Sequence, residues 1–415
     1  MANIPEINLK DFDYQLPPER IAQFPPEERD ASKLLICTDH IIKEDVFRNV
    51  GHYIPSQSIL VFNDTRVVRA RLIFSKTTGA TIEIFCLSPL SPKQEFHDAF
   101  QQTTGCIWKC LVGNVKRWKG ELLKKEFIHL GDKYVLFAQR KESLGDGCFA
   151  VEFHWEPKNK PFLELLEYAG LVPLPPYITR ASVDSDVLRY QTIYAQNEGS
   201  VAAPTAGLHF TEKVLSTLKQ KQCLFENITL HVGVGTFRPV SSPDISKHIM
   251  HGEKIHVTKK TIASILNNFG KPLIAIGTTS VRTLESLYWS GVRLLIDGAD
   301  FHPEVSQWDP YLDRYDQKIS VRKALTTLVE YLDSKKLTSY SGNTQLMIIP
   351  GYKFRFTDGM VTNFHMPQSS LLMLVAAFIG ETWRNAYDFA YQHDFRFLSY
   401  GDVCLFFYGG NKITD

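Results

Sequence analysis

Four histidines lie in short segments that are rich in small or hydroxyl residues. His209 is in VAAPTAGLHFT, His231 precedes a GVG turn, His251 is in IMHGEK, and His365 follows Asn363 in VTNFHMPQ. Imidazole transfers protons near neutral pH, so each ring is a candidate acid–base group. A single histidine in such a setting is more often structural. Four such loops together are harder to attribute to packing, and we interpret them as parts of one shared site.

The segment around His209, GSVAAPTAGLHFT, is almost free of bulky side chains. Glycine and alanine let a ligand or another chain segment approach the main chain closely. The segment therefore fits two interpretations, a ligand pocket or tight packing. Its composition alone leaves both open.

A strand followed by a helix is predicted at KPLIAIGTTSVRTLES. Thr278 and Ser280 stand at the start of this helix, where free backbone N–H groups favour an anionic group such as a carboxylate. The alternative is that one hydroxyl only caps the helix. Known nucleotide-binding loops are disfavoured: no GxxxxGK[ST] sequence occurs, and Gly233 and Gly235 lack the third glycine of a dinucleotide-binding loop.

Three histidines and one carboxylate lie close together in HIMHGEKIH. They are His248, His251, Glu253 and His256. Their spacing matches neither HExxH nor a structural zinc pattern. We therefore expect no metal, and a metal-dependent hydrolase that uses these histidines stays open as an alternative function.

The elements that must position these residues fall into two groups. Segments rich in β-branched and aromatic residues predict short strands at 81–87, 105–112, 133–140 and 148–156, and 121–130 fits a strand or a short helix. Strands at this spacing suggest a small barrel.

Strands and helices alternate through the rest of the chain, which predicts a sheet covered by helices. Helices are predicted at 211–222, 258–269, 280–290, 322–334, 368–379 and 381–392, and strands at 227–234, 272–277, 344–349 and 400–407. The segment 298–320 has little periodicity and is expected to be a surface excursion. The predicted fold is an α/β large domain (1–65 and 161–415, discontinuous) with an inserted small all-β barrel domain (66–160). In an open α/β sheet, the loops at the strand ends converge on one crevice, where ligands bind.

The predicted barrel is basic. Between residues 66 and 160 there are 16 Lys and Arg against 10 Asp and Glu, a net charge of +6, whereas the whole chain carries +1. Lysine and arginine neutralise phosphates, and a nearby ring such as Trp118 can either stack on a base or pack within the protein's own core. Two groups could contact a polyanion: Lys116, Arg117 and Lys119 in NVKRWKG, and Arg66, Arg69 and Arg71 in NDTRVVRAR. A solvated, lysine-rich surface is the other interpretation.

The composition is that of an ordinary globular protein, with 44% hydrophobic and 22% charged residues. The longest apolar stretch, LLMLVAAFIG, is about half of the roughly 20 residues that a bilayer-spanning helix needs. The N-terminus lacks the basic and apolar pattern of a secretory signal, and seven irregularly spaced cysteines indicate reduced thiols. We expect a cytoplasmic protein without membrane contact.

A series of motifs keeps its order from about residue 10 to residue 408. It comprises DFDYQLPPERIAQFP, ASKLL, VFNDTRVVRARL, LPPYITR, YQTIYA, VAAPTAGLHFT, TLHVGVGTFRPV, IMHGE, AIGTTSVRTLES, VTNFHMPQSSLLMLVAAF and LSYGDVCLF. This series resembles the S-adenosylmethionine:tRNA ribosyltransferase-isomerases, a family of queuosine biosynthesis enzymes. The resemblance implies the same fold as the segmentation above, a large α/β domain interrupted by a small β-barrel.

The resemblance also implies a reaction. The ribosyl part of S-adenosylmethionine, the co-substrate, is transferred to 7-aminomethyl-7-deazaguanine at the wobble position of a tRNA and isomerised. The products are epoxyqueuosine in tRNA, adenine and methionine. The implied partner is the tRNA that carries this base in its anticodon, and we expect a monomer with no obligate protein partner and no metal cofactor.

The resemblance carries roles onto matching positions of this chain. The candidate acid–base residues are His209, His231, His251, Glu253 and His365. The candidate substrate-binding residues are Thr205, Gly207, Gly233, Gly235, Thr278, Ser280, Arg282, Asn363 and Asp402. The two basic groups named above are the candidate tRNA contacts.

The chain departs from the family pattern in three places. Arg69 stands where proline is expected, Gly252 stands where serine is common, and the segment between about 298 and 343 is longer than in typical members. A non-catalytic tRNA-binding adapter stays open as a further alternative. It predicts tRNA binding without adenine release, whereas the metal hydrolase predicts loss of activity with a chelator.

Overall fold

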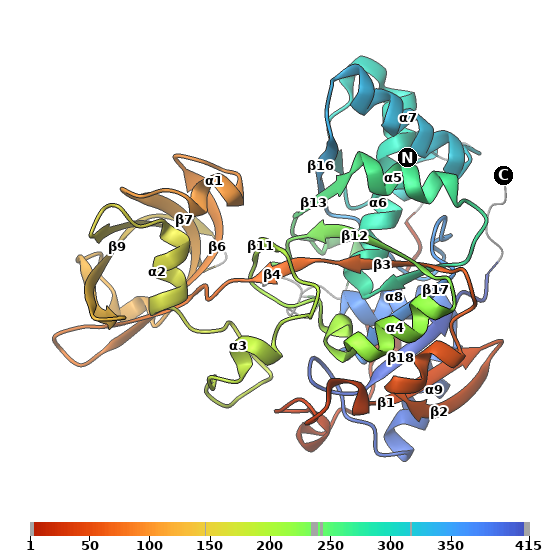
Figure 1. The fold of residues 1–415 in the computed structure, drawn as a ribbon, viewed down its shortest axis with the longest axis horizontal. Helices are drawn as coiled ribbons and strands as arrows, with labels where there is room; N and C mark the ends of the chain where they lie inside the picture. The colour runs from red at the N-terminus through yellow and green to blue at the C-terminus, as the bar shows by residue number, and fades with distance from the viewer. Residues whose placement is uncertain (1–3, 146, 234–239, 241–243, 316–317, 411–415) are drawn as a thin grey trace.

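The computed structural model describes residues 4–145, 147–233, 240, 244–315 and 318–410. Figure 1 shows two bodies, a large one that holds both ends of the described chain and a smaller one to its side. Each body is built on its own sheet with its own hydrophobic core.

The larger sheet has ten strands within the described residues and is mixed in direction. Strands β12, β3, β14 and β17 are parallel neighbours at its centre. The two central strands, β3 and β14, are buried along their whole length and apolar except for Asn63 at the end of β3, as expected for strands covered on both faces. The order across the sheet is β15 (Glu304–Val305), β16 (Ser339–Thr344), β13 (Glu253–Thr258), β12 (Leu224–Leu230), β3 (Ile59–Asn63), β14 (Leu273–Ile276), β17 (Gly359–Asn363), β18 (Val403–Phe407), β1 (Lys33–Thr38) and β2 (Ile41–Val46).

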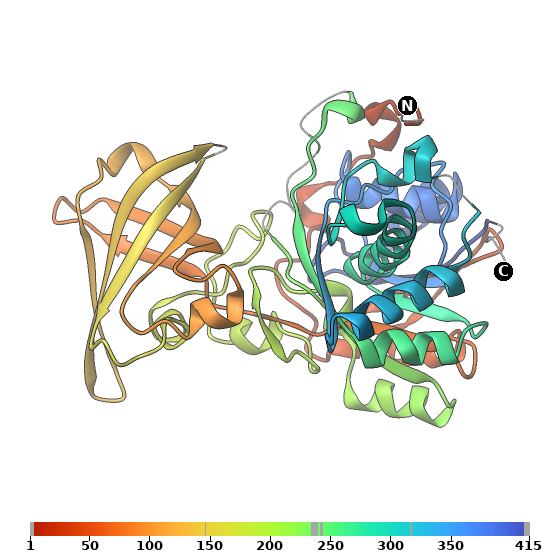
Figure 2. The ribbon, with the colours of Figure 1, turned by 90° about the horizontal axis from the view of Figure 1, so that it is seen from above.

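Helices cover this sheet, as predicted (Figure 2). They are α4 (Glu212–Gln220), α5 (Lys259–Asn267), α6 (Thr278–Asp297), α7 (Val321–Ser334), α8 (Ser370–Ile379) and α9 (Thr382–Gln392). Side-chain caps explain where several of them begin: Thr211, Ser320 and Ser369 each accept a hydrogen bond from a backbone N–H in the first turn. Apolar residues of α5 to α9 pack in one core cluster and those of α4 in another.

The smaller sheet has six antiparallel strands within the described residues. Its order is β5 (Arg71–Ser75), β6 (Thr81–Ser91), β7 (Cys106–Gly113), β10 (Cys148–Glu156), β9 (Asp132–Gly145) and β8 (Leu123–His129). Buried residues alternate with partly exposed ones along β7, as in a sheet with one face inside. The edge strands approach each other, since Lys125 Nζ on β8 donates to the Ile73 carbonyl on β5 at 3.1 Å. The sheet is therefore a nearly closed barrel, as predicted, and 121–130 supplies a strand.

Two short helices and a two-stranded ribbon join the bodies. The helices α1 (Phe96–Phe100) and α2 (Phe162–Ala169) pack on the barrel. The ribbon pairs β4 (Thr65–Val67) with β11 (Asn197–Ser200), and α3 (Asp186–Arg189) lies in the same connecting region (Figure 1). The chain thus leaves the large sheet at the end of β3 and enters the barrel through β4.

Two predictions of local structure are wrong. The strand predicted at 344–349 lies earlier, at β16, because the polar segment Ser339–Thr344 pairs with β13 at the sheet's margin. The apolar residues 346–349 are buried in the core without forming a ladder. The segment 298–320 is not a surface excursion: Val305 belongs to β15, and Tyr315 is 1% exposed and donates its hydroxyl to Asp297 of α6.

Several strands were absent from the prediction, among them β1, β2, β5 and β13. β2 is a polar edge strand, and β13 begins directly at the acidic Glu253. Among the described residues, no helix is both long and apolar enough to span a membrane.

Candidate functional site

Four predicted loops follow parallel strands and therefore lie at the same edge of the large sheet. Asn63 ends β3, His231 follows β12, Thr278 follows β14, and Asn363 ends β17. Two cavities open at this edge. We call them the sheet cavity and the junction cavity.

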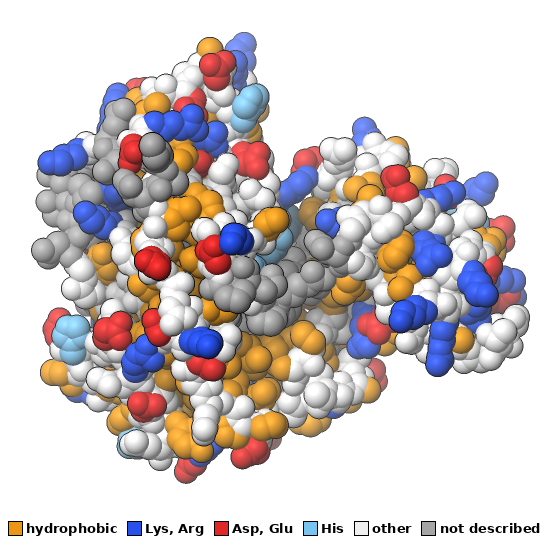
Figure 3. Space-filling model, turned by 180° about the vertical axis from the view of Figure 1, so that it is seen from behind, with side chains coloured by type: hydrophobic (Ala, Val, Ile, Leu, Met, Phe, Trp, Pro, Cys, Tyr) orange, Lys and Arg blue, Asp and Glu red, His pale blue; other side chains and the backbone are white. Residues whose placement is uncertain are grey.

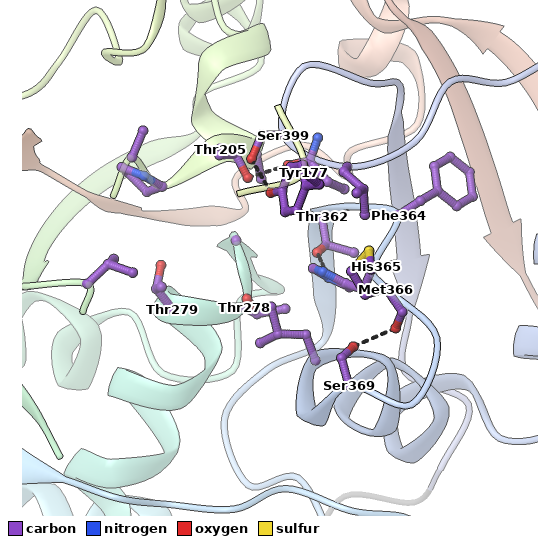
Figure 4. Close-up of a pocket in the computed structure, with 18 residues that line it drawn as sticks. Tyr177, Thr205, Thr278, Thr279, Thr362, Phe364, His365, Met366, Ser369 and Ser399 are labelled. Carbon is purple, nitrogen blue, oxygen red and sulfur yellow. Dashed lines mark hydrogen bonds between the residues drawn. The ribbon is translucent and has the colours of Figure 1, made fainter. Parts of the chain in front are cut away.

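The sheet cavity has a volume of about 80 Å³ and lies among the loops of the large sheet (Figure 4). It is lined by Tyr177, Ala203, Pro204, Thr205, Ala206, Val232, Gly277, Thr278, Thr279, Thr362, Asn363, Phe364, His365, Met366, Ser369, Leu371, Leu398 and Ser399. In Figure 4, Thr278 at the start of α6 and His365 on the loop after β17 lie on either side of the same space. The cavity thus collects four of the predicted site residues: Thr205, Thr278, Asn363 and His365.

The first turn of α6 forms one wall of the sheet cavity. Gly277 precedes it with φ of 91°, a conformation that favours glycine. Thr278 is only 7% exposed, yet its hydroxyl makes no hydrogen bond to another described residue. Thr279 is engaged, since its hydroxyl accepts a hydrogen bond from Asn63 at 3.3 Å. Thr278 is therefore the polar group of this turn that is available to a ligand.

His365 forms part of the opposite wall. Its Nε2 lies 2.9 Å from Thr362 Oγ1, and burial lowers its pKa to about 3. The ring is neutral at pH 7, because burial disfavours the charged form.

The junction cavity is larger, about 1040 Å³, and lies between the barrel and the margin of the large sheet. It is lined by Leu87, Ser88, Glu95, Phe96, His97, Phe100, Gln101, Lys109, Cys148, Gln196, Asn197, Glu198, Gly199, Thr229, His231, Val232, Gly233, His251, Gly252, Lys254, Ile255, His256, Pro303, Ser341, Gly342 and Asn343. Among the described residues, Val232 alone lines both cavities. The two spaces therefore adjoin at the residue that follows His231.

His231 is held on three sides. Its Nδ1 lies 3.1 Å from Thr65 Oγ1, and the ring of Phe96 from the barrel lies 4.9 Å from its own, measured between centroids. A Cβ on Gly199 would come within 2.8 Å of its Cε1. Nε2 has no hydrogen-bond partner among the described residues, and His231 lines the junction cavity. Burial, then the charges of Lys254 and His256, lowers the His231 pKa to about 4.

A second histidine of the junction cavity is backed by a buried ion pair. His251 Nε2 lies 3.4 Å from Glu253 Oε1, and the other oxygen of Glu253 accepts a hydrogen bond from Arg282 Nη1. Glu253 and Arg282 are 2% and 4% exposed. Arg282 Nε and Nη2 are buried without a hydrogen-bond partner among the described residues. Such groups are costly to leave unpaired, which points to a ligand or another group that pairs with them.

His209 is brought to the same region but lines neither of the two cavities. Its Nδ1 lies 2.9 Å from Ser32 Oγ and its Nε2 lies 3.2 Å from Asn363 Nδ2. Thr205 in turn donates to Asn363 Oδ1 at 2.7 Å. Burial, reinforced by Arg396 and Arg29, lowers the His209 pKa to about 3. Both ring nitrogens are thus engaged by the protein's own residues.

Three more predicted residues have their polar groups or space taken by the chain itself. Ser280 donates to the Ile276 carbonyl at 2.8 Å and does not cap α6, whose N-cap residue is Gly277. The Asp402 carboxylate accepts backbone N–H groups of Lys33 and Arg396, at 2.9 and 2.7 Å. Neither these two residues nor the third, Gly207, lines either cavity.

The third is Gly207, where a Cβ would meet the Tyr194 hydroxyl at 2.0 Å. The bare backbone beside His209 is therefore needed for packing at this position. Gly233 lines the junction cavity, whereas Gly235 lies outside the described residues.

The basic residues divide into two groups of different character. Each arginine of the first group already pairs with a carboxylate: Arg66 with Glu198 at 3.7 Å, Arg69 with Glu167 at 3.4 Å and Arg71 with Glu83 at 2.5 Å.

The second group, Lys116, Arg117 and Lys119, is exposed, and its side chains form no ion pair with described residues. Trp118 between them is 1% exposed and packs in the barrel core, so it is not available for stacking. Neither group lines the junction cavity. Figure 3 shows further Lys and Arg side chains over the outer surface of the barrel.

One buried carboxyl near the site was not singled out from the sequence. Asp64 is 5% exposed and accepts a hydrogen bond from Thr229 at 2.7 Å, while Asn197 donates to Thr229 at 3.0 Å. Burial raises the Asp64 pKa. Thr229 and Asn197 line the junction cavity, so Asp64 lies directly behind its wall. Its signal in the sequence is its place in the segment NDT, directly at the end of the buried strand β3.

The predicted histidine cluster does not form a metal site within the described residues. His256 points to Ser341, with Nδ1 and Oγ 2.9 Å apart, while His251 faces Glu253. His256 is carried by β13, whereas His251 precedes this strand, and both residues line the junction cavity.

Known proteins resemble this chain along almost its whole length. A family model described as queuosine biosynthesis protein matches residues 9–406. A protein of Aromatoleum aromaticum is 37% identical over 400 residues, covering 96% of each chain, and one of Staphylococcus epidermidis is 37% identical over 406 residues, covering 96% of this chain and 99% of that one. Both are named S-adenosylmethionine:tRNA ribosyltransferase-isomerase.

A solved structure from Thermotoga maritima, an S-adenosylmethionine tRNA ribosyltransferase, aligns over 95% of this chain and 99% of its own with 28% identity and a TM-score of 0.44. The family model covers far more than half of the chain, and its match includes the strand ends that build both cavities. The chain therefore belongs to the queuosine biosynthesis protein family.

Proposed function

We propose that this protein is an S-adenosylmethionine:tRNA ribosyltransferase-isomerase. It moves the ribosyl moiety of S-adenosylmethionine onto 7-aminomethyl-7-deazaguanine at the tRNA wobble position and isomerises it, and adenine and methionine leave. The observation that carries the proposal is the meeting of two cavities at Val232, one small and one large, since the reaction must bring two ligands into contact. The full-length family match supports the same reaction.

The donor spans both cavities in this proposal. The sheet cavity, at about 80 Å³, is smaller than the roughly 300 Å³ of a typical small-molecule pocket, so it suits only one end of the donor. The methionine carboxylate lies at the start of α6, where the helix dipole and the free Thr278 hydroxyl attract an anion. Arg282, one turn further along α6, adds positive charge behind this wall. The ribosyl and adenine parts then extend past Val232.

The target base enters the junction cavity, whose volume of about 1040 Å³ accommodates a nucleotide of an RNA loop together with the ribosyl part of the donor. Lys109 in its lining supplies positive charge for the RNA backbone, whereas the charge of Lys254 is partly neutralised by Glu95. The exposed group Lys116, Arg117 and Lys119 is a second contact for the same tRNA, further out on the barrel. Arg66, Arg69 and Arg71 have their charge partly neutralised by carboxylates and contribute less.

We assign the acid–base role to His231 before its rivals. Its Nε2 is open to the junction cavity, and the low pKa keeps the ring neutral at pH 7, ready to accept a proton from the aminomethyl group or from the ribose 5′ carbon, which the sulfonium acidifies. His251, backed by Glu253, is the second choice in the same cavity. His365 lines the sheet cavity beside the methionine end, and His209 has no free nitrogen.

The division into domains is part of this proposal. Residues 1–65 and 161–415 form the catalytic α/β domain and 66–160 the inserted barrel. The separate hydrophobic clusters of the two sheets support two domains, although α2, within 161–415, packs in the cluster of the barrel. We also propose that the protein acts in the cytoplasm as a monomer and without a metal.

The experiment is incubation with S-adenosylmethionine and a tRNA that bears the aminomethyl base, with adenine and methionine measured. The matched controls are an incubation without tRNA, which should give only tiny amounts of product, and one with a tRNA that carries guanine instead of the aminomethyl base, which should give none. Release of adenine that requires the aminomethyl base supports the proposal. Tight tRNA binding without adenine release would favour the adapter, and an activity abolished by a chelator would favour the metal hydrolase.

A further inference from the structure

The inserted barrel touches the candidate acid–base residue directly. Phe96, the first residue of α1, is 8% exposed and belongs to the barrel's hydrophobic core, where it lies 5.9 Å from Trp108 between ring centroids. The ring of Phe96 also lies 4.9 Å from that of His231, and the two rings are tilted by 44°. The hydrophobic core of the barrel thus contacts the imidazole of a residue in the large body.

The contact is tight enough to fix the ring. A Cβ on Gly199 would lie 2.8 Å from His231 Cε1 and 3.1 Å from Phe96 Cγ, so the three residues occupy one closely packed point. Thr65 engages Nδ1 on a further side. His231 also lines the junction cavity, and its Nε2 has no hydrogen-bond partner among the described residues.

A second link holds α1 in this place. Lys254 Nζ on β13 donates to the Gln94 carbonyl at 3.0 Å and pairs with Glu95 Oε1 at 2.9 Å, directly before α1. The backbone N–H of His231 donates to the Lys254 carbonyl at 3.1 Å. The segment that carries His231 and the segment that carries Phe96 are therefore tied to the same lysine.

We propose that Phe96 is a positioning residue for His231, so that the barrel completes the active site as well as contacting tRNA. The inference rests on the proposed function for its kinetic consequence, but the packing of Phe96 on His231 is testable without any substrate. Phe96 shields the ring from water and holds Nε2 toward the junction cavity. Removing the aromatic ring lets water reach the imidazole and lets it rotate.

Several charged groups also act on His231, and the test must keep them in place. They are Lys254 and His256 on β13, Glu95 before α1 and Glu198 on β11. Phe96→Leu leaves all of them unchanged, so a changed titration reports the lost ring.

The experiment compares Phe96→Leu with Phe96→Tyr and with Phe153→Leu. Phe153 is fully buried in the same barrel core but lines neither cavity, so it controls for barrel stability. We expect Phe96→Leu to lower kcat by about ten- to a hundredfold, with KM for S-adenosylmethionine changed less. We expect the pKa of the acid limb to rise from about 4 toward the ordinary value of about 6.5. Phe96→Tyr should recover most of the rate, and Phe153→Leu should leave the pH profile unchanged.

A second readout separates this inference from the function itself. The His231 signal, identified by its loss in His231→Gln, is titrated by NMR of histidine-labelled protein without substrate. A raised pKa in Phe96→Leu supports the packing role even if the wild type releases no adenine, in which case only the proposed function fails. An unchanged His231 titration and an unchanged pH profile in folded Phe96→Leu would overturn the inference.

Discussion

His209 and His231 are alike in most properties that sequence and burial can report. Each follows or precedes small residues, each has a pKa lowered by burial, to about 3 and about 4, and each lies at the loop edge of the same sheet. They differ in whether both ring nitrogens have a hydrogen-bond partner. Both nitrogens of His209 meet Ser32 and Asn363, whereas His231 keeps Nε2 for the junction cavity.

The difference separates a structural histidine from a reactive one. A low pKa follows from burial alone and is common to both. A nitrogen that points into a cavity, while the other nitrogen is oriented by a neighbour, is what proton transfer needs. The comparison therefore predicts that substitution of His231 affects rate and that substitution of His209 affects stability.

The largest expected effect is that of His231→Gln. We expect kcat for adenine release to fall by about 10²- to 10⁴-fold, the usual contribution of a general acid–base group. The unfolding midpoint should change less than the rate, because the loss is confined to the Nδ1 contact with Thr65 and the ring packing on Phe96. Adenine release under saturating substrates and thermal unfolding are measured together. A variant with more than a third of the wild-type rate would transfer the role to His251, for which His251→Gln is the parallel test.

A smaller effect is expected for Gly199→Ala. The new methyl group would lie 2.8 Å from His231 Cε1, and φ of 140° is unfavourable for alanine, so the imidazole must move. We expect kcat to fall roughly ten- to a hundredfold and stability by about 1–3 kcal/mol.

Gly79→Ala is the matched control for this substitution. Gly79 has φ of 81° but no atom within 4 Å of its Cβ position, so it carries backbone strain without a neighbour. It should lose stability and keep its rate. Equal rates in the two variants would mean that His231 does not depend on its packing.

The prediction from sequence succeeded where one strand or one helix contains the whole signal. The apolar, buried strand β14 is followed by Gly277, so the helix start that carries Thr278 could be located. The alternating pattern of β7 likewise gave the barrel. In both cases the pattern of buried residues is set by residues that are consecutive in the sequence, so the sequence alone shows it.

It failed where the decisive partner is distant in the chain. The small residues around His209 were read as possible ligand space, yet Gly207 makes room for Tyr194 and Gly199 for His231. No pattern within GSVAAPTAGLHFT predicts that Tyr194 and His231 pack against these glycines. Phe96 was missed for the same reason, because a phenylalanine on a short barrel helix looks like core until the second sheet is placed against it. The apolar run 346–349 shows the converse, since burial without pairing resembles a strand.

The smallest effect on rate is expected for His209→Ala, which sharpens the comparison from the other side. We expect adenine release at pH 7.5 to change by less than about tenfold, whereas loss of the hydrogen bonds to Ser32 and Asn363 should cost roughly 2–3 kcal/mol of unfolding free energy.

The pH dependence of His209→Ala gives an independent check. The pKa of His209 is about 3 in the folded chain and ordinarily about 6.5, so only the unfolded chain takes up its proton between these values. The wild type therefore loses stability as pH falls through this window, by up to about 1.4 kcal/mol per pH unit from this residue. The alanine variant lacks that contribution, and its stability should fall less steeply between pH 6.5 and 4 in urea unfolding. If the stability of the variant and of the wild type fell equally with pH, and the variant also lost much of its rate, His209 would again be a candidate acid–base residue. The distinction based on its two hydrogen-bonded nitrogens would then fail.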